Sequence, residues 1–124
     1  MKRLSILLLL LALSVVGGIL YYTFYSPYLI SAEEAKKMIR DKKVDVVLDV
    51  RTKMEYNLGH YPQAVHIPTQ ALQDQVETLI PDKTTRILVY CNTGQRARYA
   101  TDLLKAKGYK HVNYIAGTYT TLLR

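Results

Sequence analysis

A chain of 124 residues provides for one small domain and no more. Its 17 Lys and Arg outnumber its 10 Asp and Glu, a balance that favours anionic ligands or a membrane surface. No run of five like charges occurs, and aromatic residues do not alternate with basic ones, so we expect no nucleic-acid binding. The one cysteine excludes an intramolecular disulfide and a zinc site of cysteine pairs. The three histidines lack the paired spacing of a helical metal site, and we expect neither a metal nor an organic cofactor.

The N-terminal segment contains an uncharged, strongly apolar run from Leu4 to Tyr25, preceded by Lys2 and Arg3. As a helix, residues 4–25 would span roughly 33 Å, about the thickness of the hydrocarbon core of a bilayer. Tyrosines gather at the far end of the run, where aromatic rings favour the boundary between membrane and water. We therefore predict that residues 4–25 form a transmembrane anchor. The positive-inside rule then places the rest of the chain on the extracytoplasmic, periplasmic side.

A cleaved secretory signal is the alternative interpretation of the same segment. Ala12-Leu13-Ser14 or Val15-Val16-Gly17 would be weak cleavage sites, and cleavage would leave a very apolar new N-terminus, so the anchor is favoured. Cleavage would instead release a soluble periplasmic protein. Both interpretations divide the chain into an N-terminal anchor or signal segment, residues 1–25, and one domain, residues 26–124.

Residues 26–124 alternate between helical and strand patterns with short connections. A capping-box signature at Ser31–Glu34 predicts a helix to about Arg40, and the β-branched segment Val44–Val50 predicts a buried strand. The later predicted elements are a helical turn, a strand, a helix, a strand, a helix and a last strand: Lys53–Leu58, Ala64–Ile67, Gln70–Leu79, Arg86–Tyr90, Gln95–Lys107 and His111–Ile115. This order predicts an α/β domain of three layers with a mostly parallel central sheet.

Cys91 directly follows the strand Arg86–Tyr90, at the sheet edge where α/β domains bind their ligands. The loop that follows leads into the start of a helix, where backbone N–H groups and the helix dipole favour anions. Gly94 permits the unusual backbone angles of such an anion cradle, and Arg96 adds positive charge. This setting favours a reactive thiolate. The alternative is an inert buried cysteine that acts as a small apolar side chain.

Two segments resemble the motifs of the rhodanese-like domain family. LDVRTKMEYNLGHYPQAVHIP (Leu48 to Pro68) is similar to its D-x-R, E-(Y/F) and G-H-(I/Y)-x-x-A-x-(N/H)-I-P element. VYCNTGQRARYATDLLKAKGYKHVNYIAG (Val89 to Gly117) is similar to its active-site loop, following helix and last strand. The nearest resemblance is to the small, exported, single-domain members of the phage-shock type. The resemblance implies a rhodanese-like fold and sulfurtransferase activity.

The resemblance also implies roles for individual residues. Cys91 would be the nucleophile that carries a persulfide, and Asn92, Thr93, Gly94, Gln95 and Arg96 would form the substrate-binding cradle. Asp49, Arg51 and Glu55 would support the site, and we expect Arg51 to pair with Glu55. His60 and His66 match motif positions that are mainly architectural.

Four residues separate Cys91 from Arg96, whereas phosphatases of the related fold place five between the same residue types. The shorter loop resembles the sulfurtransferase version and disfavours arsenate or phosphate chemistry. The family usually carries a Gly-Gly pair after the last strand, where this chain has Ala116-Gly117, and its C-terminal tail is short. These differences bear on access to the site and on donor preference.

The sequence thus predicts a thiosulfate-type sulfurtransferase that moves sulfur in two steps through Cys91. Its partners would be a small anionic sulfur donor and a thiol or cyanide acceptor. The alternative from another class is a non-enzymatic sulfur-relay or docking module tethered at a membrane.

Overall fold

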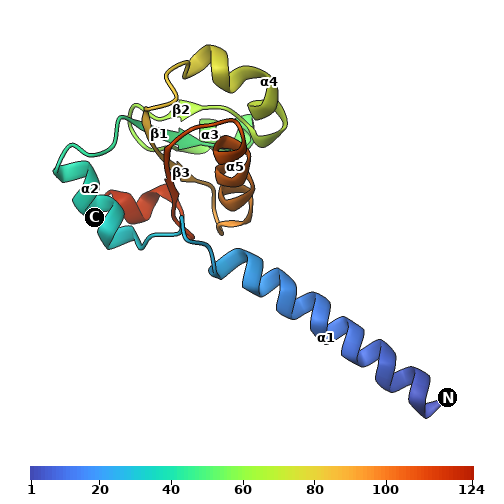
Figure 1. Cartoon of the computed structure of the whole chain (residues 1–124). Helices are drawn as coiled ribbons and strands as arrows, with labels where there is room; N and C mark the ends of the chain where they lie inside the picture. The colour runs from blue at the N-terminus through green and yellow to red at the C-terminus, as the bar shows by residue number, and fades with distance from the viewer.

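The computed structural model describes residues 1–124, with the side chains of all except Thr23 and Phe24. Helix α1 (Lys2–Phe24) projects away from an α/β domain (Figure 1). Its stretch Lys2–Tyr22 is long and apolar enough to cross a membrane, and none of it is buried within the protein. A helix at the core of a soluble domain would be mostly buried, so α1 is a candidate membrane span or signal helix.

A sheet of four parallel strands forms the middle of the domain, in the order β2-β1-β3-β4. The strands are β1 (Val46–Asp49), β2 (Val65–His66), β3 (Arg86–Tyr90) and β4 (His111–Tyr114). β1, β2 and β4 are shorter than predicted, whereas β3 has the predicted bounds. The buried strands β1 and β3 lie side by side at the centre, and β3 delivers Cys91 at its carboxyl end.

Helices cover both faces of the sheet. On one face, α4 (Thr69–Leu79) and α5 (Gln95–Ala106) contribute Leu72, Val76 and Leu104 to a core with Leu48 and Val89. On the other face, α2 (Ala32–Arg40) and the 3₁₀ helix η1 (Tyr119–Leu122) pack on β1 and β3. This arrangement confirms the predicted three-layer fold with a parallel sheet. The helix η1 was not predicted.

Side-chain caps fix where two of the helices begin. Ser31 Oγ accepts a hydrogen bond from the Glu34 N–H and begins α2, as predicted. The reciprocal capping box occurs at α3 (Lys53–Leu58), where Thr52 Oγ1 accepts from the Glu55 N–H and the Glu55 carboxylate accepts from the Thr52 N–H. The short α3 thereby brings Glu55 to the carboxyl edge of the sheet.

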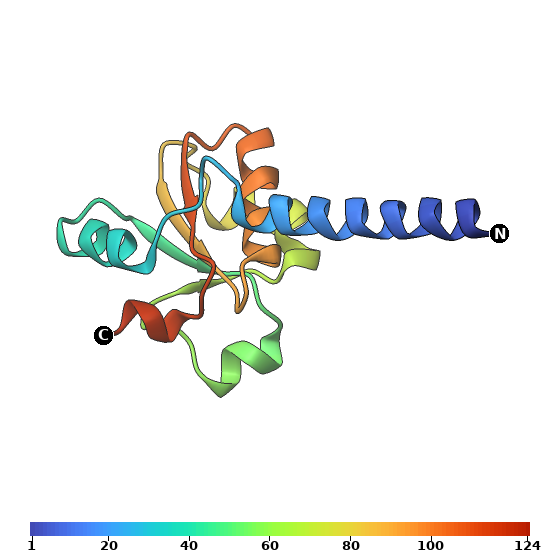
Figure 2. The ribbon, with the colours of Figure 1, turned by 90° about the horizontal axis from the view of Figure 1, so that it is seen from below.

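The end of α1 is joined closely to the domain (Figure 2). Arg98 on α5 places its guanidinium carbon 4.2 Å from the centre of the Tyr22 ring and donates to the Tyr22 carbonyl, while Tyr22 Oη donates to Asp102 Oδ2 at 3.2 Å. Leu29 then forms an isolated parallel bridge with Tyr114 of β4, in which the Tyr28 carbonyl accepts from Tyr114 N at 3.0 Å. The chain therefore passes from α1 onto the sheet through only a few residues.

Candidate active site

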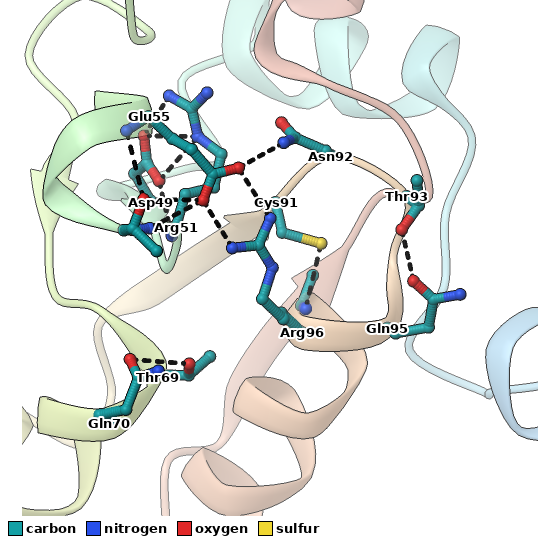
Figure 3. A network of polar contacts seen from close by, with 12 residues as sticks. Asp49, Arg51, Glu55, Thr69, Gln70, Cys91, Asn92, Thr93, Gln95 and Arg96 are labelled. Atoms are coloured by element: carbon teal, nitrogen blue, oxygen red, sulfur yellow. Dashed lines mark hydrogen bonds and ion pairs between the residues drawn. The ribbon is translucent and has the colours of Figure 1, made fainter. Parts of the chain in front are cut away.

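The Cys91 sulfur lies at the junction between β3 and α5, where the sequence places the reactive group (Figure 3). The side chain is 1% exposed. Two backbone N–H groups nevertheless point at it: Gly94 N lies 3.2 Å from Sγ and Ala97 N lies 3.4 Å from it. Cys91 is also a member of the apolar core on this face of the sheet. Backbone N–H groups at the start of a helix are a common anion-binding arrangement, and here two of them converge on the sulfur.

Gly94 shapes this arrangement. It is the N-cap of α5 and has φ +102°, in the left-handed region that side chains rarely adopt. A Cβ on Gly94 would lie 3.1 Å from Cα of Ala116, so the loop also packs closely on the segment after β4. The predicted glycine requirement at this position therefore has a steric as well as a conformational reason. The role of Ala97 was missed, because a backbone donor leaves no mark on residue type.

The side chains of Asn92, Thr93 and Gln95 form hydrogen bonds with groups other than the sulfur. Asn92 Nδ2 donates a hydrogen bond to Glu55 Oε2 at 2.6 Å, and the Thr93 hydroxyl donates one to Gln95 Oε1. Arg96 makes a two-pronged ion pair with Glu55: Nη1 lies 2.7 Å from Oε1 and Nη2 lies 3.0 Å from Oε2. The loop and α3 are thus held together by one carboxylate beside the sulfur (Figure 3).

The expected pairing of Arg51 with Glu55 is wrong. Arg51 pairs with Asp49, with Nη2 and Oδ2 2.7 Å apart, and also donates to the Gly59 carbonyl. In an extended strand, residues two apart project to the same side, so Asp49 meets Arg51 directly. Tyr90 Oη completes the cluster by donating to Asp49 Oδ2 at 2.6 Å.

This cluster is a buried scaffold under the loop. Asp49 is fully buried and Arg51 is 5% exposed, and the Arg51 guanidinium lies near the rings of Tyr90 and Tyr119. Burial, together with the hydrogen bond to Asp49, raises the pKa of Tyr90 well above its usual range, so its hydroxyl remains a donor. The carboxyl ends of β1 and β3 are therefore held by the Asp49–Arg51 ion pair and the Tyr90 hydroxyl as well as by apolar contacts.

His60 and His66 lie beside the same region in structural positions. Both rings stack on Tyr56, His60 Nδ1 lies 2.9 Å from the Tyr56 carbonyl oxygen, and His66 Nε2 lies 2.7 Å from that of Arg51. Each ring uses one nitrogen to hold the backbone between β1 and β2. These contacts are those of architectural residues, as the sequence led us to expect.

The Glu55–Arg96 pair is ionised. Hydrogen bonds from Arg96 hold the pKa of Glu55 far below its usual range, and bonds to the Thr52 N–H and hydroxyl act in the same direction. The pKa of Arg96 is raised, chiefly by its hydrogen bonds to Glu55. Figure 3 shows the Arg96 guanidinium between the Glu55 carboxylate and Cys91.

A shallow hollow of about 310 Å³ opens beside the loop, lined by Thr69, Gln70, Gln95, Arg96 and Tyr99. A larger hollow of about 480 Å³ lies among residues at the amino ends of the strands, including Val44, Arg86 and His111, and contains no residue of the Cys91 loop. The smaller hollow lies at the carboxyl ends of the strands, where parallel sheets bind ligands, and is lined by Gln95 and Arg96 of the loop but not by Cys91 itself.

A model of the rhodanese-like domain matches residues 31–122. The chain belongs to the rhodanese-like domain family. This rhodanese-like chain is 34% identical over 70 residues to the thiosulfate sulfurtransferase PspE of Escherichia coli, covering 56% of this chain and 67% of that protein. A rhodanese with anions from E. coli is 33% identical, with a TM-score of 0.56, covering 61% of this chain and 88% of that one.

Two further comparisons show a shared fold at low identity and a relative that is much longer than this chain. The human single-domain sulfurtransferase TSTD1 shares the fold, with a TM-score of 0.68 over 79% of this chain and 96% of that one, at 24% identity. A tRNA uridine(34) hydroxylase of Buchnera aphidicola is 32% identical over 92 residues, but the rhodanese-like chain spans only 28% of its length. Relatives and fold together make the protein a rhodanese-type sulfurtransferase.

Replacing Gly94 with alanine is expected to lower sulfur-transfer activity strongly, because the Cβ requires both a shift of the Ala116 backbone and a strained φ. Rearranging the loop moves the Gly94 N–H away from Sγ. Gly108→Ala is the matched control, since Gly108 also has a positive φ, +95°, but its Cβ would meet nothing within 4 Å. Steady-state assays of both variants test this: equal activity losses would show that the cradle geometry does not matter.

Proposed function

We propose that the protein transfers a sulfane sulfur from thiosulfate or a related donor to a thiophilic acceptor through a persulfide on Cys91. The observation that carries this proposal is the pair of N–H groups, from Gly94 and Ala97, aimed at one buried sulfur. They stabilise negative charge there before reaction, when the sulfur is a thiolate, and would do so again when it is a persulfide.

The cycle has two displacement steps. In the first, the Cys91 thiolate attacks the outer sulfur of thiosulfate; a new S–S bond forms, the donor's S–S bond breaks, and sulfite leaves with the electron pair. In the second, a thiolate or cyanide attacks the outer sulfur of the persulfide, and Cys91 leaves as the thiolate with which the cycle began. No net oxidation is needed, and each half-reaction can run separately.

The proposed binding residues have distinct tasks in this cycle. Gly94 holds the loop in shape, and Arg96, whose guanidinium lies beside the sulfur in Figure 3, would bind the anionic group of the donor. Asn92, Thr93 and Gln95 keep the loop closed through their side-chain bonds. Asp49 and Arg51 support the loop from below, as a buried ion pair that does not reach the reactants.

Intact mass spectrometry of the full chain tests the first half-reaction. After incubation with thiosulfate in the absence of an acceptor, the protein is expected to gain the mass of one sulfur atom, and dithiothreitol should remove it. Peptide mapping should place the added atom on Cys91. A protein that turns over thiosulfate and cyanide without ever carrying this adduct would contradict the persulfide route.

We also propose that α1 remains as a membrane anchor, with the domain on the extracytoplasmic side. The length, apolar composition and exposure of Lys2–Tyr22 support a membrane span, and the contacts of Arg98 and Asp102 with Tyr22 tie the end of α1 to α5. Figure 1 shows the loop between β3 and α5 on the side of the domain from which α1 departs. The active site would then face the membrane surface.

Fractionation is expected to find the protein in the membrane, with Lys2 and Arg3 retained. N-terminal sequencing after carbonate washing measures this directly, and protease protection in spheroplasts reports the side of the membrane. A soluble periplasmic form that begins near Ser14 or Gly17 would show instead that the segment is a cleaved signal.

A further inference from the structure

The hollow of about 480 Å³ at the amino ends of the strands takes no part in the proposed sulfur transfer. Four apolar side chains line it, from α2, the segment before β1, β3 and β4: Met38, Val44, Ile87 and Val112. Sites for small organic molecules in proteins measure about 300–1,000 Å³ and are lined mostly by apolar side chains with a few polar groups. The size and lining of this hollow therefore suit an organic ligand.

Positive charge surrounds the apolar lining of this hollow. Lys43, Lys105 and Lys110 line it, and among the described residues none of the three forms an ion pair with a carboxylate. Arg86 also lines it, but Asp45 balances the Arg86 charge. The lining residues that the structure describes include no Asp or Glu. The charge of the hollow therefore favours an anion.

One of these ammonium groups is already fixed in place. Lys105 Nζ donates a hydrogen bond to the Lys110 carbonyl at 2.9 Å and lies 4.8 Å from the centre of the Tyr28 ring. The Tyr28 backbone is held in turn, because its carbonyl accepts from Asn113 Nδ2 at 3.3 Å. A Lys ammonium carries three N–H donors, so Lys105 keeps donors for a ligand. Little side-chain entropy is lost when a group held in this way binds.

We propose that this hollow is a second binding site, which takes a small organic anion with an apolar body, of the class of aromatic or acyl carboxylates. The three lysines would bind the carboxylate, and the four apolar side chains would cover the body of the ligand. A protein partner fits less well, because a stable protein interface uses roughly 20–30 residues on each side, more than line this hollow.

The proposed site is separate from the Cys91 site. Strand β3 begins at Arg86, which lines the hollow, and ends at Tyr90, so the two sites lie at opposite ends of the sheet. Five residues along a strand cover roughly 16 Å. An anion in the hollow does not touch the sulfur, and we expect it to change the rate of Cys91 loading by thiosulfate less than twofold. This inference is independent of the proposed function, and either can fail without the other.

Photo-crosslinking of the full chain in lipid nanodiscs tests the proposal, with 4-benzoylbenzoate as the probe. An irradiated benzophenone attacks methionine side chains efficiently, and this chain has three methionines. Met38 lines the hollow, whereas Met54 on α3 is 75% exposed and lies outside it. We expect labelling of Met38 that saturates with probe concentration, and labelling of Met54 that only rises in proportion to it. Peptide mapping by mass spectrometry measures both.

Lysine variants test the role of charge. The probe concentration that half-saturates Met38 labelling should rise about tenfold in Lys105→Gln and about threefold in Lys43→Gln, because each loses one attractive charge. Lys43 is exposed and has no described side-chain contact, so Lys43→Gln remains informative if Lys105→Gln folds poorly. Lys53→Gln is the matched control: it removes the same charge from an exposed residue of α3 and should leave the half-saturating concentration unchanged.

Three results would overturn the proposal. The first is equal labelling of Met38 by the uncharged amide 4-benzoylbenzamide, which would show that the hollow does not select anions. The second is displacement of the probe by inorganic phosphate as readily as by 2-naphthoate, which would show that the apolar lining does not contribute. The third is labelling of Met38 that never saturates, which is the behaviour of an open surface or of a face that docks a protein.

Discussion

Cys91→Ser is expected to lower kcat/KM for sulfur transfer by a factor on the order of 10⁴ or more, the size of loss seen when an enzyme's nucleophile is removed. A serine hydroxyl at this position is a much weaker nucleophile than a thiolate, and its oxygen does not form a stable link to sulfane sulfur. A thiosulfate:cyanide assay measures the rate, and intact mass after thiosulfate should show no sulfur adduct.

The serine variant should keep its fold, which makes the comparison clean. Serine differs from cysteine in one atom, and its oxygen can accept from the N–H groups of Gly94 and Ala97 that now point at Sγ. Thermal unfolding of the two proteins provides the control. Substantial turnover in a correctly folded Cys91→Ser protein would mean that another group carries the sulfur.

Asp49→Ala should lower the free energy of unfolding by about 3–5 kcal/mol, the typical cost of leaving a buried charge without its partner. Arg51 is 5% exposed and would keep its charge between the Tyr90 and Tyr119 rings, bonded to the Gly59 carbonyl but without a carboxylate partner among the described contacts. Tyr90 would also lose the acceptor of its hydroxyl. Urea unfolding of both proteins, followed by circular dichroism, measures the difference.

The exposed pair of Asp45 and Arg86 is the natural control for this experiment. Its side chains are 43% and 44% exposed, although the atoms lie at the same 2.7 Å separation as in the buried pair. Asp45→Ala should leave the free energy of unfolding almost unchanged, because water screens an exposed pair. Similar losses of unfolding free energy in the two variants would show that burial does not determine how much the Asp49–Arg51 pair contributes to stability.

The elements with strong local patterns were predicted well. β3 and α3 have the bounds expected from the sequence, and α5 begins at Gln95 as predicted, because each is set by neighbouring residues. The capping box at Thr52–Glu55 was not predicted, although Thr52 and Glu55 have the same spacing as Ser31 and Glu34, which indicated the start of α2. The helix η1 carries no comparable signal, and its position depends on packing against α2.

The ion pairs of the site were the hardest feature to predict. Arg51 and Glu55 are four apart, which suggests a helical pair, but α3 begins only at Lys53, and Arg51 still follows the geometry of β1. Glu55 meets Arg96 across 41 residues of sequence because β1 and β3 are neighbours in the sheet. Residue types alone do not encode that register.

The short connection between α1 and the sheet limits where the catalytic domain can go. Only Tyr25, Ser26 and Pro27 separate Phe24 from Tyr28, the first residue bonded to β4. Fully stretched, three residues reach about 10 Å. If α1 is the membrane anchor proposed above, this tether would keep the domain next to the lipid headgroups, and its sulfur acceptors would have to reach it at that surface.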